Sequence, residues 1–371
     1  MASILERAET NTALVHEQLH TGEAFVLDFA RLKSGQNRRE LLEVIEKAAP
    51  TGFLHIVNHG LDPKLFQTLR KVTYDVMTAT MEEKDRDTAV EGTGSFEGYK
   101  PRTPEEIRQG ILPGIEEYNY DYNSPGTITR PKVIQENEIS IRTVFDFYHS
   151  ELTPALLSLL GDYCDLDLIE GHTKATEVAH FLLYHPHWYN DTDKKRAAYG
   201  GHTDIGSLTY LNCNPVAGLQ IYGPNGWVYA AYVENSIVVN AGDALEYMTG
   251  GKINATLHRV IKPVHGQKND PRPAIPFFVH PNHDVMVASL QATKERRERL
   301  TAESRAKPGH PVDSIGLNRI ISALSIQRED IYLEAIDGQA WLAAKRKGLV
   351  NSPPGVVINY HNLALSRPFS I

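Results

Sequence analysis

Two histidines and one aspartate stand at positions from which their side chains can share a metal ion. His202 and Asp204 belong to the motif Gly-Gly-His-Thr-Asp, and His258 begins a later apolar segment. Residues i and i+2 of a β-strand project from the same side, so His202 and Asp204 can face a common centre. Two imidazoles and one carboxylate on one side of an ion leave coordination positions open, which suits Fe(II) that must bind a co-substrate and O₂. Closed structural zinc sites lack these open positions.

Spacing alone leaves a second interpretation of these three residues open. The sequence holds 16 histidines, so a His-x-Asp match is expected about once by chance. The three side chains could therefore be hydrogen-bonded polar residues of a β-core.

Arg272 adds a permanent positive charge near the same segments. It precedes the mostly apolar stretch 273–278 (PAIPFF), so its guanidinium could lie at one end of a buried strand. A buried guanidinium needs an anion, and a dicarboxylate that reaches it from the metal would supply one. Alternatively, Arg272 lies on the surface and pairs with Asp270.

The first third of the chain is predicted to mix helices with a strand. Apolar residues recur at three- and four-residue spacings over 38–49 and 63–86, which predicts two helices that each bury one stripe. The apolar run 53–57 between them predicts a strand that ends in a turn.

The next part of the chain alternates between irregular and helical patterns. Residues 87–133 are rich in Gly, Pro, Thr and Tyr, and we expect a long irregular segment with a functional role. Helical spacing returns over 134–163, although Pro154 should interrupt or restart that helix.

Between about 177 and 281 the apolar pattern changes to that of strands. Short apolar segments separated by turn residues are typical of a β-sandwich or barrel. The stretch 240–243 (NAGD) is interpreted as a structural tight turn in which Gly242 permits a positive φ. The predicted strand segments are 177–185, 206–211, 217–222, 226–233, 236–241, 258–264 and 274–280.

The chain is predicted to be one structural unit, since it shows no internal repeat and no linker. It divides into an N-terminal helical and mixed region (1–170), a β-core (171–290) and C-terminal helices with a tail (291–371). Charged helices are expected over 291–307 and 327–347. The proline-containing tail 350–371 could close over the site.

Composition excludes several classes of protein. The formal net charge is −8, with 38 Lys and Arg against 46 Asp and Glu, which opposes a broad grip on nucleic acid. Two cysteines are too few for a disulfide-stapled secreted domain. Charged residues interrupt the N-terminus and no apolar run approaches about 18 residues, so neither a signal peptide nor a membrane span is expected. We expect a cytosolic protein, and its oligomeric state is left open.

Several stretches together resemble the Fe(II)/2-oxoglutarate-dependent dioxygenases of the isopenicillin N synthase-like family. The resemblance covers most of the chain, and the central stretch is most similar to thymine-hydroxylase-like, pyrimidine-oxidising members and to fungal small-molecule members. The matching stretches, in order, are LDFARL (27–32), TGFLHIVNHGL (51–61), GGHTDIGSLTYL (200–211), GLQIY (218–222), VVNAGDAL (238–245), TLHRVI (256–261) and RPAIPFFVHPNHD (272–284).

The resemblance implies a mainly β fold with flanking helices, built on a double-stranded β-helix (jelly roll). It implies that His202, Asp204 and His258 bind Fe(II), and that Arg272 and Tyr184 bind the co-substrate 2-oxoglutarate. The implied activity is O₂-dependent oxidation of a small organic molecule such as a secondary metabolite, with release of succinate and CO₂. Hydroxylation is the default outcome, and desaturation or ring rearrangement are related outcomes.

Two departures from the family pattern leave alternatives open. Ala274 stands where family members usually carry a serine two residues after the arginine, and the usual Tyr-Pro is stretched to Tyr-His-Pro at Tyr184. One alternative is an iron oxidase of the same fold that uses no 2-oxoglutarate, with Arg272 holding a substrate carboxylate. Another is a non-catalytic jelly-roll binding protein.

Candidate substrate contacts come from the tyrosine-rich irregular segment and from the strand that follows Arg272. Each of them could equally be an ordinary surface or core residue. These candidates are Tyr99, Tyr118, Asn119, Tyr120 and Phe278.

Overall fold

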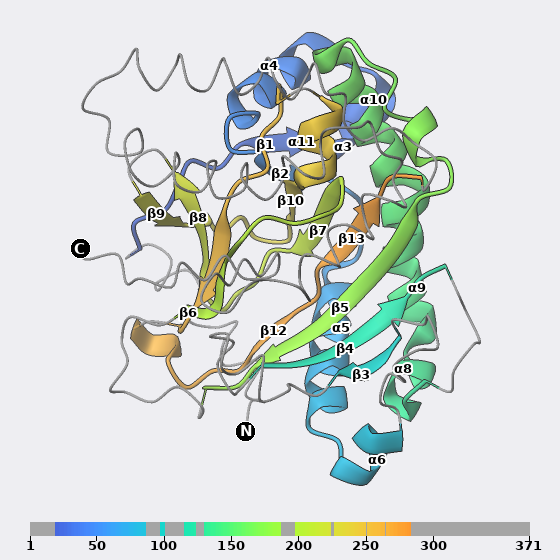
Figure 1. The fold of residues 1–371 in the computed structure, drawn as a ribbon, viewed down its shortest axis with the longest axis vertical. Helices are drawn as coiled ribbons and strands as arrows, with labels where there is room; N and C mark the ends of the chain where they lie inside the picture. The colour runs from blue at the N-terminus through green and yellow to red at the C-terminus, as the bar shows by residue number, and fades with distance from the viewer. Residues whose placement is uncertain are drawn as a thin grey trace, which may run out of the picture.

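The computed structural model shows a molecule built from two β-sheets and a layer of helices (Figure 1). It describes residues 19–86, 97–100, 115–123, 130–186, 197–223, 226–249, 251–263 and 265–282. The C-terminal helices predicted within 291–371 and the predicted tail lie outside the described residues.

The N-terminal elements follow the expected helix–strand–helix order with one correction. The strand 53–57 is confirmed, but the single helix expected over 63–86 is two helices. Thr80 and Glu83 form a reciprocal capping box, in which the Thr80 backbone N–H donates to Glu83 Oε2 at 3.0 Å and the Glu83 N–H donates to Thr80 Oγ1 at 3.3 Å. This box starts a new helix. The elements are β1 (Val26–Asp28), α3 (Phe29–Ser34), α4 (Arg38–Ala48), β2 (Phe53–Val57), α5 (Pro63–Met77) and α6 (Met81–Arg86).

The stretch expected over 134–163 is helical, but Pro154 does not interrupt it as predicted. Pro154 lies in the first turn of α10 (Thr153–Cys164), but the backbone before it stays helical through Leu152, so the helix continues without a break and a π-helical turn accommodates the missing N–H. One turn of π-helix, η1, precedes it. The elements are α8 (Lys132–Glu136), α9 (Glu138–Phe147), η1 (Tyr148–Leu152), α10 (Thr153–Cys164) and the 3₁₀ turn η2 (Glu170–His172).

The segment 87–133 was expected to be irregular, and this prediction is wrong for two stretches. β3 (Gly98–Lys100) and β4 (Ile115–Asp121) are antiparallel strands of the large sheet. In the sequence of β4, IEEYNYD, Ile115 shares a face with Glu117 and Asn119, and Glu116 shares a face with the tyrosines, so the apolar–polar alternation by which a strand is usually predicted is incomplete.

The remaining strands form two sheets. The large sheet has the order β1-β2-β10-β7-β13-β5-β4-β3, with β12 also paired to β5, and only β1 and β2 run parallel in it. The small sheet has the order β6-β11-β8-β9. The strands are β5 (Thr176–Tyr184), β6 (Ala197–His202), β7 (Leu208–Asn212), β8 (Leu219–Gly223), β9 (Gly226–Tyr229), β10 (Ile237–Ala241), β11 (His258–Ile261), β12 (Arg272–Ala274) and β13 (Phe277–His280); α11 (Asp243–Met248) and the 3₁₀ turn η4 (His265–Gln267) join them.

The two faces of the large sheet have different partners. One face packs against α5, α9 and α10 (Figure 1). Residues at alternate strand positions, such as Phe181, Tyr210 and Phe277, are fully buried there. The opposite face meets the small sheet, where Leu182 and Tyr184 of β5 cluster with Val260 of β11. Two sheets that enclose such an interior form the expected jelly roll, and strands β1–β4 from the N-terminal region belong to the same large sheet.

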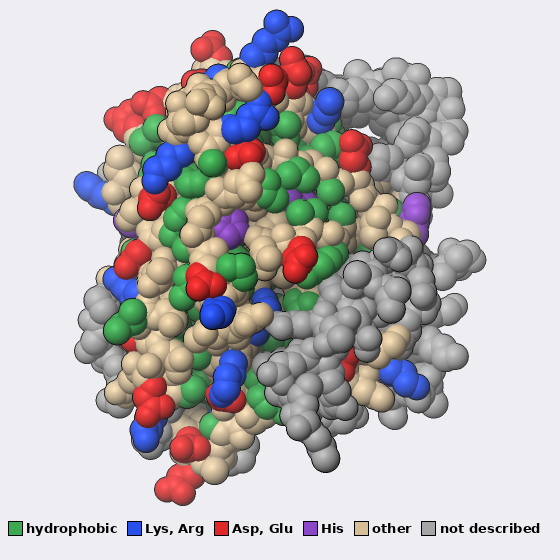
Figure 2. All heavy atoms as spheres, turned by 180° about the vertical axis from the view of Figure 1, so that it is seen from behind, with side chains coloured by type: hydrophobic (Ala, Val, Ile, Leu, Met, Phe, Trp, Pro, Cys, Tyr) green, Lys and Arg blue, Asp and Glu red, His purple; other side chains and the backbone are tan. Residues whose placement is uncertain are grey.

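The surface and the helices agree with the composition. Basic and acidic side chains are interspersed over the face shown in Figure 2. Among the described residues, the helices are all too short or too polar to cross a membrane.

A buried carboxylate on the helix side of the large sheet should make stability depend on pH. Burial raises the pKa of Glu177 to about 7 from an ordinary value of 4.5, although His149, whose Nδ1 lies 2.7 Å from Oε2, works to lower it. Between pH 4.5 and about pH 7, Glu177 keeps its proton in the folded protein but loses it in the unfolded chain. The free energy of unfolding therefore falls as pH rises through this range.

We therefore expect Glu177→Gln to stabilise the protein relative to wild type at pH 8 but not at pH 4.5. The difference in free energy of unfolding between variant and wild type should change by about 3 kcal/mol between the two pH values. Chemical denaturation at the two pH values measures this difference. The same comparison in a His149→Ala background removes the titration of the imidazole. If this difference in free energy of unfolding is the same at both pH values, the pKa of Glu177 is not raised.

Candidate active site

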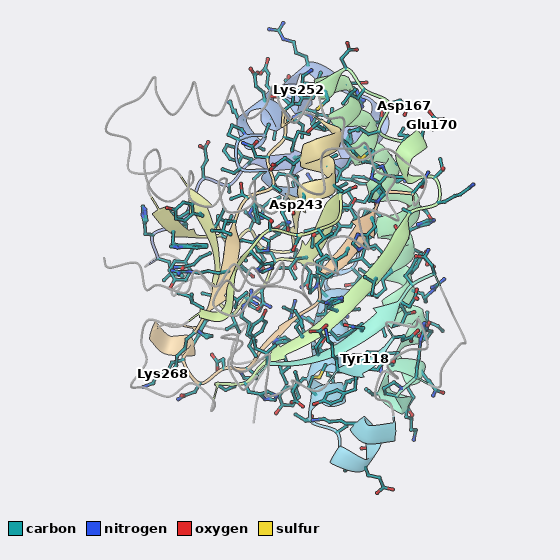
Figure 3. All side chains as sticks on the ribbon, viewed as in Figure 1. Tyr118, Asp167, Glu170, Asp243, Lys252 and Lys268 are labelled. Atoms are coloured by element: carbon teal, nitrogen blue, oxygen red, sulfur yellow. The ribbon has the colours of Figure 1, made fainter. Side chains whose placement is uncertain are left out.

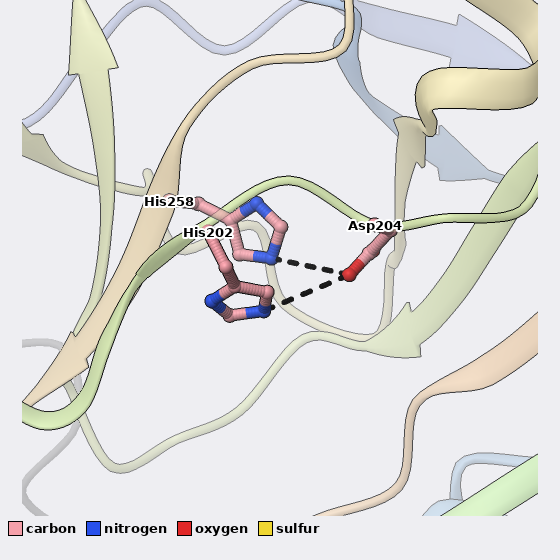
Figure 4. Close-up of side chains that lie close together, drawn as sticks. All are labelled: His202, Asp204 and His258. Atoms are coloured by element: carbon pink, nitrogen blue, oxygen red, sulfur yellow. Dashed lines mark ion pairs between the residues drawn. The ribbon is translucent and has the colours of Figure 1, made fainter. Parts of the chain in front are cut away.

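The three predicted metal ligands converge between the two sheets (Figure 4). His202 ends β6, His258 begins the neighbouring strand β11, and the two are paired directly across the antiparallel ladder. Asp204 lies in the turn after β6. Its Oδ1 lies 3.7 Å from His202 Nε2 and 3.6 Å from His258 Nε2. These side chains therefore come from two strands and a turn, yet their ligand atoms all lie within 4.8 Å of one another.

This arrangement fits a divalent metal ion with open coordination positions. Ligand atoms 2.0–2.2 Å from an ion and at right angles to one another are about 3 Å apart, so each histidine nitrogen needs to approach Asp204 Oδ1 by less than about 1 Å. The three ligand atoms lie within 4.8 Å of one another, so the two histidine nitrogens need to approach each other by at most about 2 Å. His258 Nδ1 lies 3.1 Å from the backbone oxygen of Thr256. That contact favours a proton on Nδ1 and leaves Nε2 as the ligand atom.

Asp204 is held by its second carboxylate oxygen. Thr209 Oγ1 donates to Oδ2 at 2.6 Å and Asn240 Nδ2 donates to it at 2.8 Å, which turns Oδ1 toward the histidines. Burial acts to raise the pKa of Asp204, but the facing His258 and His202 and these two hydrogen bonds together hold its pKa below the ordinary value. The carboxylate is therefore kept in the charged form that a metal requires.

The stretch 240–243 was interpreted as a tight turn, and the structure corrects this interpretation. Asn240 belongs to β10 and supports Asp204, while α11 begins directly at Asp243. Gly242 is not among the residues with positive φ. A Cβ atom there would lie 2.2 Å from the backbone oxygen of Gly206, so close packing accounts for the glycine. Asn240 and Thr209 could have been suspected only from their positions in matching family stretches.

Arg272 and Tyr184 lie directly opposite each other on β12 and β5. Arg272 is 2% exposed, so it is buried and is not a surface residue. Its guanidinium carbon lies 5.5 Å from the centre of the Tyr184 ring, and its Nε donates to the backbone oxygen of Val216 at 3.1 Å. Ala274, in place of the usual serine, packs in the apolar cluster with Leu182. Arg272 is thus a buried charged group beside the apolar cluster of Ile115, Leu182, Tyr184, Val260 and Ala274.

The backbone near Arg272 is adapted to its side chain. A Cβ atom at Gly218 would lie 2.8 Å from the backbone oxygen of Ile261 and 3.3 Å from Arg272 Nε. Any larger residue at position 218 would therefore displace the arginine or the neighbouring strand β11.

The predicted substrate contacts divide between the two faces of the large sheet. Tyr118 and Tyr120 are fully buried on the helix side, where Tyr118 lies beside α5 (Figure 3) and Tyr120 donates to Glu138. Tyr99 pairs with Tyr118 and is on the same face. These three tyrosines therefore point away from the three predicted metal ligands and belong to the core on the helix side. Asn119 and Phe278 lie on the face that meets the small sheet.

Two family models match the chain on either side of the helical segment 138–173. The model of the 2OG-Fe(II) oxygenase superfamily matches residues 174–281, and a model named for the N-terminal part of non-haem dioxygenases in morphine synthesis matches residues 26–137. The first range contains His202, Asp204, His258 and Arg272. The matched ranges together contain both sheets of the fold.

Known proteins of similar sequence and structure agree with these matches. A flavonol synthase/flavanone 3-hydroxylase of Matthiola incana is 27% identical over 263 residues, which cover 67% of this chain and 83% of that protein. A 1-aminocyclopropane-1-carboxylate oxidase of Malus domestica is 27% identical over 319 residues, covering 82% and 93%. A full-length Neurospora crassa protein, crystallised in complex with alpha-KG, has a TM-score of 0.65 at 19% identity, covering 89% of this chain and 98% of that chain. The similarity to this fungal protein shows a shared fold.

Proposed function

Since this chain belongs to the 2OG-Fe(II) oxygenase superfamily, we propose that His202, Asp204 and His258 hold its Fe(II) and that Arg272 and Tyr184 bind its 2-oxoglutarate. The protein is an oxidoreductase, an Fe(II)- and 2-oxoglutarate-dependent dioxygenase that acts on a small organic molecule. The observation that carries the residue assignment is the convergence of Asp204 Oδ1 with the two histidine Nε2 atoms at 3.6 and 3.7 Å.

Each residue of the site has a separate task. Fe(II) in this site supplies the centre at which O₂ is activated, with 2-oxoglutarate consumed to succinate and CO₂ as the substrate is oxidised. Asp204 offers Oδ1 as a ligand while Thr209 and Asn240 fix its orientation. The buried Arg272 binds the distal carboxylate of 2-oxoglutarate through its planar guanidinium.

Apolar neighbours keep water from this interior. Leu182, Ala274 and Val260 pack around Tyr184 between the two sheets. A low-dielectric environment strengthens the pairing of Arg272 with a carboxylate.

The direct test is co-substrate dependence. Protein loaded with Fe(II) under anaerobic conditions should consume O₂ and release succinate when 2-oxoglutarate is added. O₂ consumption on a substrate without 2-oxoglutarate would instead indicate the related iron oxidases. Iron binding without O₂ consumption or succinate release over a broad substrate panel would indicate a non-catalytic binding protein.

The substrate itself is proposed to be a secondary metabolite that is hydroxylated, desaturated or rearranged. Support comes from relatives named flavonol synthase and 1-aminocyclopropane-1-carboxylate oxidase, and from a structure of the Neurospora crassa protein in complex with alpha-KG and thymine. We also propose a cytosolic location, supported by the free thiols of Cys164 and Cys213.

The hydrogen bond from Thr209 to Asp204 gives a further prediction. Thr209→Val keeps the shape of the side chain but removes the donor to Oδ2, and we expect the affinity for Fe(II) to fall about 10- to 100-fold. Metal titration of the apo-protein measures this change. Thr153→Val is the matched control, because Thr153 is also buried and its Oγ1 lies 2.8 Å from Tyr210 Oη on the helix side. Equal iron affinities in the two variants would show that Thr209 does not support the ligand.

A further inference from the structure

The interior of the jelly roll contains a buried amide whose oxygen lacks a hydrogen-bond donor. Asn119, in the middle of β4, is 4% exposed. Within the described part of the chain, no group donates a hydrogen bond to its Oδ1. A buried acceptor without a donor is costly, so such an atom in a folded protein requires a partner.

The side chain of Asn119 points into the space between the sheets. Asn119 is paired with His180 across the ladder between β4 and β5. It lies four residues after Ile115, and residues i and i+4 of a strand share a face. Ile115 packs with Val260 of the small sheet, so this face of β4 borders the same interior as the metal ligands.

A continuous row of side chains connects the metal centre to Asn119. Thr209, which donates to Asp204, is paired with Phe278 on the next strand. The Phe278 ring packs edge-to-face on His180 with centroids 4.8 Å apart, and His180 is paired with Asn119. The four strands β7, β13, β5 and β4 are adjacent in the sheet, and Phe278 lies opposite Val178, two residues from His180. Thr209 and Asn119 therefore lie about 16 Å apart at roughly 4.8 Å per strand and 3.3 Å per residue.

Glu117, a polar neighbour of Asn119 on β4, fixes the position of the His180 imidazole. Glu117 is 4% exposed and lies two residues before Asn119 on the same face. Its Oε1 lies 3.3 Å from His180 Nδ1. This contact holds the imidazole of His180 in place against Phe278. The amide of Asn119 lies at the end of this row that is farthest from the predicted metal ligands.

We propose that Asn119 recognises the substrate and that the substrate is a planar molecule with a lactam or imide edge. This inference rests on the oxygenase function proposed above, since the molecule must extend from the metal centre. Oδ1 accepts the ring N–H and Nδ2 donates to the adjacent carbonyl, so one amide edge satisfies both ends of the side chain. Phe278 and His180 contact the flat ring. A single hydroxyl group could donate a hydrogen bond to Oδ1, but it cannot pair with Oδ1 and Nδ2 at the same time in the plane of the amide.

Matched probes test this assignment on the enzyme loaded with Fe(II) and 2-oxoglutarate under argon. The probe pairs are uracil and 1,3-dimethyluracil, 2-quinolone and N-methyl-2-quinolone, and phthalimide and N-methylphthalimide, with 2-naphthol as a hydroxyl probe. Calorimetric or NMR titration gives each dissociation constant. We expect the N–H member of at least one pair to bind about tenfold more tightly than its methylated partner and than 2-naphthol.

The Asn119→Leu variant should lose this preference while it keeps its fold. Removing the unpaired acceptor should leave the melting temperature unchanged or raise it. Asn212→Leu is the matched control, since Asn212 is 3% exposed on β7 and also has an amide atom, Nδ2, without a partner among the described residues. Asn212 lies on the helix side of the sheet, beside Ile237, and its variant should keep the preference for N–H probes.

Three results would overturn the inference: equal binding of both members in every pair, tighter binding of 2-naphthol than of every lactam, or an intact preference in Asn119→Leu. Succinate formation from 2-oxoglutarate in air, without any substrate, separates this inference from the proposed function. If wild type and Asn119→Leu both turn over 2-oxoglutarate slowly and equally, the oxygenase assignment stands whatever the probes show. If neither forms succinate with any probe, the oxygenase assignment itself fails.

Discussion

Replacing His258 with alanine is expected to remove bound Fe(II) and with it succinate formation. His258 supplies one of three converging ligand atoms, and the remaining His202 and Asp204 would hold an ion through two contacts. Since metal catalysis contributes several kcal/mol to such reactions, we expect turnover to fall about 1,000-fold or more. Iron content after equilibrium dialysis and the rate of succinate release measure the two effects separately.

His55→Ala is the matched control for this variant. His55 is 5% exposed on β2, and its Nδ1 lies 3.0 Å from Ser236 Oγ. It is thus a buried histidine with a structural partner, whose loss should lower stability and leave iron content unchanged. Wild-type iron content in His258→Ala would remove this residue from the ligand set.

Replacing Arg272 with leucine is expected to raise the concentration of 2-oxoglutarate required for half-maximal rate by about 30-fold or more. Arg272 is 2% exposed, and loss of one partner from a buried hydrogen-bonded charge pair costs about 2–5 kcal/mol. Iron affinity should change little, because the side chain supplies no metal ligand. Titration of 2-oxoglutarate into the Fe(II)-loaded variant, followed by succinate assays over a wide concentration range, measures the shift.

Two further variants separate charge from shape at this position. Arg272→Lys keeps the positive charge but loses the planar fork, and we expect an intermediate requirement for 2-oxoglutarate. Arg259→Leu is the matched control. Arg259 follows His258 on β11 but points to the other face, where its guanidinium lies 4.1 Å from the centre of the Trp227 ring. If Arg272→Leu and Arg259→Leu have the same requirement as wild type, Arg272 binds something else.

Local sequence was sufficient for the elements with strong periodicity. The helix expected over 38–49 is Arg38–Ala48, and the strand expected over 53–57 is Phe53–Val57. Both have a regular or continuous apolar pattern, which local residue types determine. The motif also identified His202 and Asp204 as two candidate ligands, although β6 ends at His202 and Asp204 lies after it, so the two residues do not share a strand face as expected.

Tertiary structure alone decided which polar residues support these ligands. Thr209 and Asn240 lie on separate segments of the sequence, and they meet at Asp204 because β7 and β10 pair with Asn240 opposite Thr209. Strand pairing depends on how whole faces of the sheet pack against residues distant in the sequence, so no local sequence pattern predicts it.

The same reason explains the division among the substrate candidates. The sequence alone marked Tyr118, Asn119 and Tyr120 as one aromatic and polar group, and residue type offered no ground for separating them. Successive side chains of a strand point to opposite faces, so pairing of β4 with β5 sends the two tyrosines to the helices and Asn119 to the metal side. The residue types were thus sufficient to predict the chemistry of the metal centre. The face of the sheet to which each side chain points depended on the register of strand pairing in the folded protein.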